Sequence, residues 1–265
     1  MLSRGSYSGG KLLSECLAAN LSYRSIDRET IIARASGCGT TERKLRHALE
    51  KPPGFWDRFR EDRRRYLTLF QACLTDELGG GNVIYTGHSA HLLLGGVSHV
   101  LRVRIIAPLA FRLAAVQDAL QLGRDAALAY IRRQDEDRAR WTRYLYGVDW
   151  SDPALYDLVL NLEHMPIAEA CEIVAASARQ PGFAETEESR AAMADLALSY
   201  RVTAALLTGA ETSELALDVK ARAGTVALHG KVRNRKQLEA VERIVRGTPG
   251  VTRAVLDGLI QVLDA

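Results

Sequence analysis

The stretch Ser3-Arg4-Gly5-Ser6-Tyr7-Ser8-Gly9-Gly10-Lys11-Leu12-Leu13-Ser14 decides the fold of this chain. Gly5, separated by four residues from Gly10-Lys11, has the spacing of a phosphate-binding loop. In such a loop glycines let backbone N–H groups surround an anion, and the lysine reaches the outer phosphates. Apolar residues then recur at the three- and four-residue steps of a helix, at Leu12, Leu13, Cys16, Leu17 and Leu21. The loop would therefore deliver phosphate to a helix N-terminus, where free N–H groups and the helix dipole favour negative charge.

Two features of this stretch depart from the usual pattern. A Ser or Thr that holds magnesium normally follows the lysine, but here the first hydroxyl after Lys11 is Ser14. Only four residues precede Gly5, which is short for a buried strand. Either the strand is stunted, or the true start lies upstream of Met1. A Gly/Ser-rich turn ahead of an amphipathic helix remains the alternative to a nucleotide site.

Composition places the chain among soluble globular proteins. It has 265 residues, of which 47% are hydrophobic and 25% charged, so it can form one large or two ordinary domains. The net charge of +3 gives no general field for nucleic acid, and basic residues matter only as local clusters. We therefore expect no nucleic-acid partner.

The four cysteines, Cys16, Cys38, Cys73 and Cys171, show no metal-ligand spacing and no disulfide framework. We expect buried, reduced thiols. His88 and His91 lack a third ligand, so we predict no metal centre of protein ligands. No apolar run approaches the roughly 20 residues that span a bilayer, and the N-terminus carries no apolar signal segment, so we expect a cytoplasmic protein with no transmembrane segment.

Short apolar runs alternate with helical patterns along the first part of the chain. Strands are expected at 22–27, 82–86, 101–107 and 156–161, and helices at 41–50, 55–79, 110–122, 125–146 and 167–177. This alternation predicts an α/β fold, a parallel sheet with helices on both faces. Asp27 ends one strand, where it either lies at the ligand-binding edge of the sheet or caps the next helix.

A polar stretch with a Pro-Gly turn, residues 179–189, reads as a linker between domains at 1–178 and 190–265. Beyond it we expect a helix at 190–207, strands at 217–220, 224–232 and 251–256, and a second helix through Leu238, Val241, Ile244 and Val245. Alternation along 225–232 predicts a small sheet with one face covered by helices.

With these motifs in order, the first part of the chain resembles the cytidylate kinase-like branch of the P-loop nucleoside monophosphate kinases, over roughly residues 3–177. The motifs are the loop at 3–11, Ile26-Asp27-Arg28, the segment 51–59, 105–109, Asp135-x-x-Arg138, 146–150 and 156–157. The second part resembles a BON domain, through 224–232 and the Thr248-Pro249-Gly250-Val251 turn. That resemblance implies contact with a ligand, a lipid or a protein partner rather than catalysis.

The kinase resemblance implies ATP as donor, with Mg²⁺, and a nucleotide as acceptor. We expect the donor phosphates in a cradle of Gly5, Ser6, Tyr7, Ser8, Gly9 and Gly10. The groups expected to act on the transferring phosphoryl group are Lys11, Arg133, Arg138 and Arg140. The residues expected on the acceptor side are Asp27, Arg28, His88, Asp135 and Asp137.

The kinases carry Gly-Arg-Asp after the third strand, whereas this chain has Gly87-His88-Ser89. A histidine, mostly neutral at pH 7, lacks the guanidinium fork that grips phosphate. The leading hypothesis is an ATP-dependent phosphotransferase on a nucleoside monophosphate or a similar small phosphorylated acceptor. The rival is a nucleotide-binding sensor without turnover, whose second domain contacts a partner or membrane surface. RNA binding by the arginine helices is less favoured, since no strand surface interleaves aromatic stacking platforms.

Overall fold

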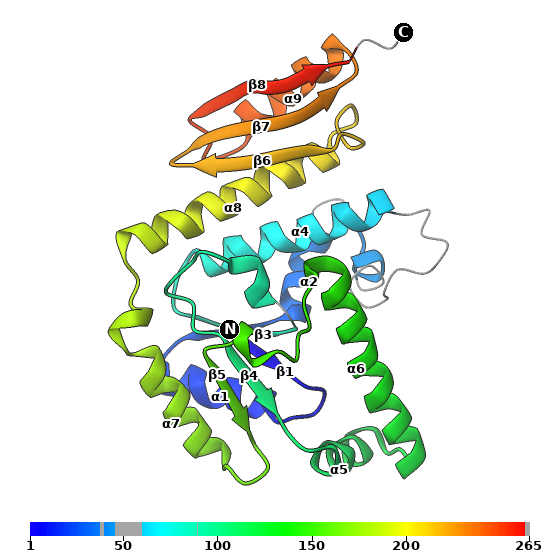
Figure 1. Ribbon diagram of the computed structural model, residues 1–265, viewed down its shortest axis with the longest axis vertical. Coiled ribbons are helices and arrows are strands. Elements are labelled where there is room, and N and C mark those ends of the chain that lie inside the picture. The colour runs from blue at the N-terminus through cyan, green and yellow to red at the C-terminus, as the bar shows by residue number, and fades with distance from the viewer. Residues whose placement is uncertain (38–39, 46–59, 89, 263–265) are drawn as a thin grey trace. The chain divides into compact units, whose positions relative to one another are not determined.

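The computed structural model describes residues 1–37, 40–45, 60–88 and 90–262 (Figure 1). The motif at 51–59, Ser89 and Cys38 lie outside this part of the chain. The described residues pack into two compact units. The first comprises residues 1–30 and the described residues of 81–186, and the second comprises residues 31–37, 40–45, 60–80 and 187–262.

The first unit is built on a five-stranded parallel sheet with the strand order β2-β3-β1-β4-β5. Its strands are β1 (Leu2–Arg4), β2 (Arg24–Asp27), β3 (Val83–Gly87), β4 (Val103–Ile106) and β5 (Leu158–Asn161). Its helices are α1 (Gly10–Leu21), α5 (Leu109–Leu120), α6 (Arg124–Tyr146) and α7 (Ile167–Ala178). The predicted α/β phosphate-loop fold is confirmed.

β1 is only three residues long, yet it lies at the centre of the sheet. Leu2 pairs with Thr86 of β3 on one side and with Val103 of β4 on the other. Because two neighbours supply its hydrogen bonds and Leu2 is only 2% exposed, a stunted strand suffices here. Its carboxyl end leads directly into the loop at Gly5.

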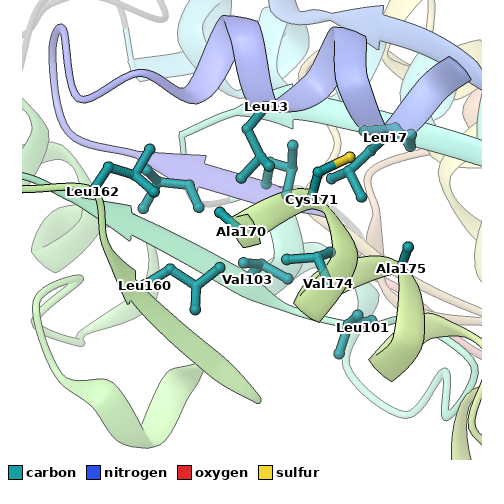
Figure 2. Packing of buried hydrophobic residues seen from close by; sticks show 13 residues of the cluster. Leu13, Leu17, Leu101, Val103, Leu160, Leu162, Ala170, Cys171, Val174 and Ala175 are labelled. Carbon is teal, nitrogen blue, oxygen red and sulfur yellow. The ribbon is translucent and has the colours of Figure 1, made fainter. Parts of the chain in front are cut away.

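A cluster of buried residues in the first unit joins α1 and α7 to the sheet. Leu13 and Leu17 of α1 meet Val174 of α7 above Val103 and Leu160 of the strands (Figure 2). The helix predicted from the apolar spacing is present, and Leu13 and Leu17 pack it against the sheet.

The expectation of reduced cysteines is wrong for two of the four. Cys16 of α1 and Cys171 of α7 form a disulfide, with Cα atoms 6.2 Å apart and a sequence separation of 155 residues. Cys171 is fully buried in the cluster that joins the two helices. The pairing depends on two helices that meet only in the folded chain, so spacing in sequence could not reveal it. Cys73 forms no disulfide.

The second unit contains a three-stranded mixed sheet and its helices. β6 (Leu217–Arg222) runs antiparallel to β7 (Thr225–Val232), and β8 (Arg253–Gln261) runs parallel to β7. Helices α8 (Glu187–Thr208) and α9 (Arg235–Gly247) bury Val202 and Val241 in the same cluster as Val226 and Leu228. The alternation predicted along β7 is confirmed, because its even-numbered apolar residues face the helices.

Two helices from the region between β2 and β3 also belong to the second unit: most of α2 (Arg28–Ser36) and all of α4 (Arg60–Leu78). α4 packs along α8, where Arg201 pairs with Asp76 at 2.6 Å. Arg64 also donates to the Leu217 carbonyl at 3.2 Å. The boundaries at 178 and 190 stay a prediction. No helix within the described ranges is long and apolar enough to cross a membrane.

Candidate functional site

The phosphate loop lies between β1 and α1. The Gly5 N–H and the Ser8 hydroxyl hold it in place. Gly5 donates its N–H to the Ile105 carbonyl at 3.2 Å. The buried Ser8 hydroxyl lies within hydrogen-bond distance of two carbonyls, those of Gly5 (3.0 Å) and Ile105 (3.3 Å). Gly9 has φ 85°, and an added Cβ would lie 3.0 Å from a methyl group of Leu162. Glycine is therefore required at the turn into the helix.

The first N–H groups of α1 are open. At this end of the helix the first helical hydrogen bond runs from the Leu13 N–H to the Gly9 carbonyl. The N–H groups of Gly10, Lys11 and Leu12 have no acceptor among the residues that the structure describes. Three unpaired donors at the positive end of a helix dipole form an anion site.

Buried arginines approach the loop from one side. Arg138 of α6 donates to the Arg4 carbonyl at 3.0 Å. Arg112 of α5 donates to the Ser6 carbonyl at 2.8 Å and pairs with Asp135 of α6 at 2.8 Å. Helices α5 and α6 are therefore tied to the backbone of the phosphate loop itself.

More cations than carboxylates act electrostatically on Arg138. Burial, followed by the nearby cations Arg4, Arg112 and Arg28, lowers the pKa of Arg138 to about 10, against the opposite effect of Asp135. The Arg4 Nε atom and the Ser6 hydroxyl are buried without a hydrogen-bond partner in the described chain. Buried, mutually repelling cations beside unpaired donors indicate a site for a strongly anionic group.

Lys11 is in the loop, but its side chain does not turn over it. Its side chain is 85% exposed, and its ammonium group lies 3.9 Å from Glu15, one turn along α1. Such an exposed pair is weak, so a bound anion could compete for the lysine at little cost. Its action on outer phosphates stays a prediction.

On the acceptor side, Asp27 caps α2. Its Oδ1 accepts from the Thr30 N–H at 2.9 Å and from the Thr30 hydroxyl at 2.7 Å. Burial raises the pKa of this carboxyl, but the hydrogen bonds from Thr30 outweigh it and the pKa lies below its usual value. Arg28, the next residue, lies close enough to act electrostatically on Tyr85, His88 and Arg138. The structure thus brings Arg28 and Arg138 to one place.

Two predicted arginines point elsewhere. Arg140 pairs with Asp137 at 2.6 Å, and Arg133 lies 4.0 Å from the same carboxylate. The side chains of Arg133 and Arg140 are 79% and 62% exposed. To grip a phosphate, each would have to leave Asp137. Their part in phosphate binding stays a prediction, as does that of Asp137.

His88 contacts α6. Its Nε2 lies 2.9 Å from the Thr142 hydroxyl and 3.3 Å from the Arg138 carbonyl. Its ring meets the edge of Trp150 with centroids 5.1 Å apart. Burial and the charge of Arg138 lower the pKa of His88 to about 3. The imidazole is therefore neutral at pH 7. Its Nε2 atom, which would have to contact an acceptor nucleotide, is already hydrogen-bonded to α6.

The residues of the loop fit a phosphate group better than they fit a protein-bound magnesium ion. Leu12, at the position of the usual magnesium-binding hydroxyl, is 59% exposed. The Ser14 hydroxyl is already bonded to Ser25 at 2.8 Å and to Thr86 at 2.9 Å. The described residues include no group of three metal-binding side chains. The site therefore supplies donors for phosphate and no evident hydroxyl for the metal.

Comparison with known proteins agrees with this geometry. The sequence model of the cytidylate kinase-like family matches residues 1–164. The chain belongs to the cytidylate kinase-like family. The BON domain model matches residues 194–257, so both resemblances seen in the sequence are confirmed. No curated protein matches the chain.

Solved structures similar to the chain include an uncharacterized protein from Eubacterium ventriosum, at 14% identity and a TM-score of 0.51, covering 67% of this chain and 95% of that one. TT1252 from Thermus thermophilus shares 18% identity at a TM-score of 0.41, over 68% and 96% of the two chains. A shikimate kinase from Acinetobacter baumannii, in complex with shikimate, shares 16% identity at a TM-score of 0.38, covering 65% of this chain and 88% of that one. At 14% identity, the structure from Eubacterium ventriosum supports the fold alone.

Sequence reasoning missed two members of the site, Arg4 and Arg112. Arg4 is adjacent to the glycine loop, and its side chain packs over Gly10, where a Cβ would collide with it. Its position next to the glycine loop could have identified Arg4 from the sequence. Arg112 lies on an otherwise unremarkable helix, and only the tertiary contact with Ser6 reveals it.

Two buried histidines should make stability fall in mild acid. Burial is the main cause that lowers the pKa of His88 to about 3 and of His91 to about 4, whereas both titrate near 6.5 in the unfolded chain. Between pH 6.5 and 4 the unfolded state binds more protons, so the free energy of unfolding falls as pH falls, by about 1.4 kcal/mol per pH unit for each histidine. Below the folded pKa values the loss levels off.

Chemical denaturation at pH 7, 6 and 5 measures this slope. His88→Gln should remove about half of it, and the exposed His164→Gln serves as the matched control that leaves it unchanged. A slope that stays the same in His88→Gln would contradict the burial of a neutral imidazole at this position.

Proposed function

We propose that the chain is an ATP-dependent phosphotransferase that acts on a nucleoside monophosphate, cytidylate-like, or on a similar small phosphorylated acceptor. One observation carries the proposal: open N–H groups begin α1 beside the buried cation of Arg138. Phosphoryl transfer needs positioning and positive charge more than covalent chemistry, and this arrangement offers both. Membership in the cytidylate kinase-like family supports the same reading.

In this proposal the loop from Gly5 to Gly10 cradles the donor phosphates. Lys11 leaves Glu15 to neutralise their outer oxygens. Arg138, already at the loop, stabilises the charge on the transferring group, and Arg28 faces the acceptor. Magnesium would arrive on the phosphates of the nucleotide and help to neutralise them, since Leu12 provides no ligand.

The rival proposal is a nucleotide-binding sensor with little or no turnover. Two observations favour it: the exposed Leu12 in place of a metal-binding hydroxyl, and the engagement of the His88 Nε2 by α6 where the kinases carry an arginine. Its BON domain would contact a ligand, a lipid surface or a protein partner.

One assay separates the two proposals. The purified chain is given ATP, magnesium and a panel of nucleoside monophosphates, and ADP formation is followed beside ATP affinity. ADP formation that requires one particular acceptor supports the transferase. Affinity for ATP without ADP formation supports the sensor, and the absence of both would refute each of them.

A further inference from the structure

We propose that His88 is a positioning residue for the donor site: its Nε2–H holds the middle of α6, and this places the Arg138 guanidinium on the phosphate loop. The proposal rests on the proposed nucleotide site. It assigns to His88 a different role from the acceptor contact that the resemblance implies.

The hydrogen-bond geometry fixes which atom of His88 carries the proton. The Thr142 hydroxyl lies 2.9 Å from the Arg138 carbonyl, to which it donates one turn back along α6. With its proton used there, Thr142 offers His88 lone pairs, and so does the Arg138 carbonyl at 3.3 Å. The Nδ1 atom is buried without a partner in the described chain. An unpaired acceptor is tolerated better than an unpaired donor, so the proton lies on Nε2.

The hydrogen bond from His88 to α6 lies where it can position the Arg138 guanidinium. The bond ends on the Arg138 backbone carbonyl, and the same residue's guanidinium donates to the Arg4 carbonyl at 3.0 Å. Trp150, which is only 8% exposed, packs against the ring in a T-shaped contact and limits its movement. His88 directly follows β3, so α6 is fastened to the end of a sheet strand one residue past Gly87.

The neutral state of the ring makes this attachment compatible with the cations nearby. A protonated imidazole, or an arginine, at position 88 would add a buried positive charge beside Arg138 and Arg28, which already act electrostatically on this residue. The chain therefore substitutes a neutral donor for a charged one, and the positive charge of the site is supplied from α6 and β1 instead.

A double-mutant cycle on binding tests the proposal. The affinity for a non-hydrolysable ATP analogue is measured by calorimetry for the full chain and for His88→Ala, Arg138→Ala and the double variant. We expect His88→Ala to weaken binding about tenfold in the parent, and to cause less than a twofold further loss when Arg138 is already alanine. His88→Gln, whose amide can donate at a similar reach, should bind within about twofold of the parent.

Each outcome decides between the readings. An equal loss in both backgrounds would show that His88 acts independently of Arg138 and would overturn the positioning role. Unchanged affinity in His88→Ala would do the same. If His88→Ala fails to fold, Thr142→Val removes the acceptor hydroxyl with nearly the same shape, and the same cycle is run with it. Absence of binding by the parent chain would overturn the nucleotide site as well, which the other outcomes leave intact.

Discussion

Reducing the Cys16–Cys171 disulfide should lower the free energy of unfolding of the first unit by about 5 kcal/mol, if chain entropy alone acts. The reason is the 155-residue separation, because a longer closed loop restricts the unfolded chain more. Native disulfides typically contribute about 2–5 kcal/mol, so even the lower end is a large part of the stability of a domain. Thermal unfolding with and without dithiothreitol measures the difference, with an expected fall in Tm of roughly 5–20 °C.

Cys73→Ser is the matched control, since Cys73 forms no disulfide, and its Tm should respond to reductant as the parent does. Cys171→Ser should lose the response. Thiol titration of the unfolded, unreduced chain should find Cys16 and Cys171 unreactive. Four reactive thiols, with a Tm indifferent to reductant, would show that the pair is not joined.

The disulfide also bears on where the protein works. Disulfides persist in oxidising compartments and are uncommon in the reducing cytosol. The cytoplasmic location expected from the sequence therefore stays a prediction, and thiol trapping in intact cells tests it.

Arg138→Ala should weaken the binding of an ATP analogue about 10- to 100-fold. A charge-assisted hydrogen bond to an ionised group contributes about 1.5–3 kcal/mol, and each 1.4 kcal/mol is a factor of ten. The loss should exceed that of any single exposed arginine of α6, because Arg138 is buried against the loop and poorly screened. Calorimetry on both proteins gives the ratio.

Arg132→Ala is the matched control for this substitution. It removes the same charge from the same helix, but Arg132 is exposed. Its effect on affinity should be within about twofold. Equal losses in the two variants would mean that the general charge of α6, and not the contact of Arg138 with the loop, attracts the nucleotide.

Much of the fold could be predicted because its signals are local. The glycine spacing at 5–10, the apolar steps along α1 and the β-branched runs of β3 and β4 each depend on neighbours in sequence. The short β1 was ambiguous for a physical reason. Its stability comes from β3 and β4 on either side, and these lie about a hundred residues away.

The site was predicted only in part, because its decisive contacts are between distant segments. Asp135-x-x-Arg138 could be found as a motif, but that Arg138 reaches Arg4 while Arg133 remains at the surface depends on how α6 is rotated. The contact of Arg112 with Ser6 spans 106 residues. The disulfide has the same character, because no spacing rule joins residues 16 and 171.

The most direct test of the central claim is the response of the α1 N–H groups to nucleotide. In amide nitrogen–proton NMR spectra, adding an ATP analogue should shift the signals of Gly10, Lys11 and Leu12, since these donors have no partner within the described chain. The side-chain Nε–H of Arg138 should shift with them. If these amide signals stay in place at saturating nucleotide, the loop does not bind the phosphates, and the account fails.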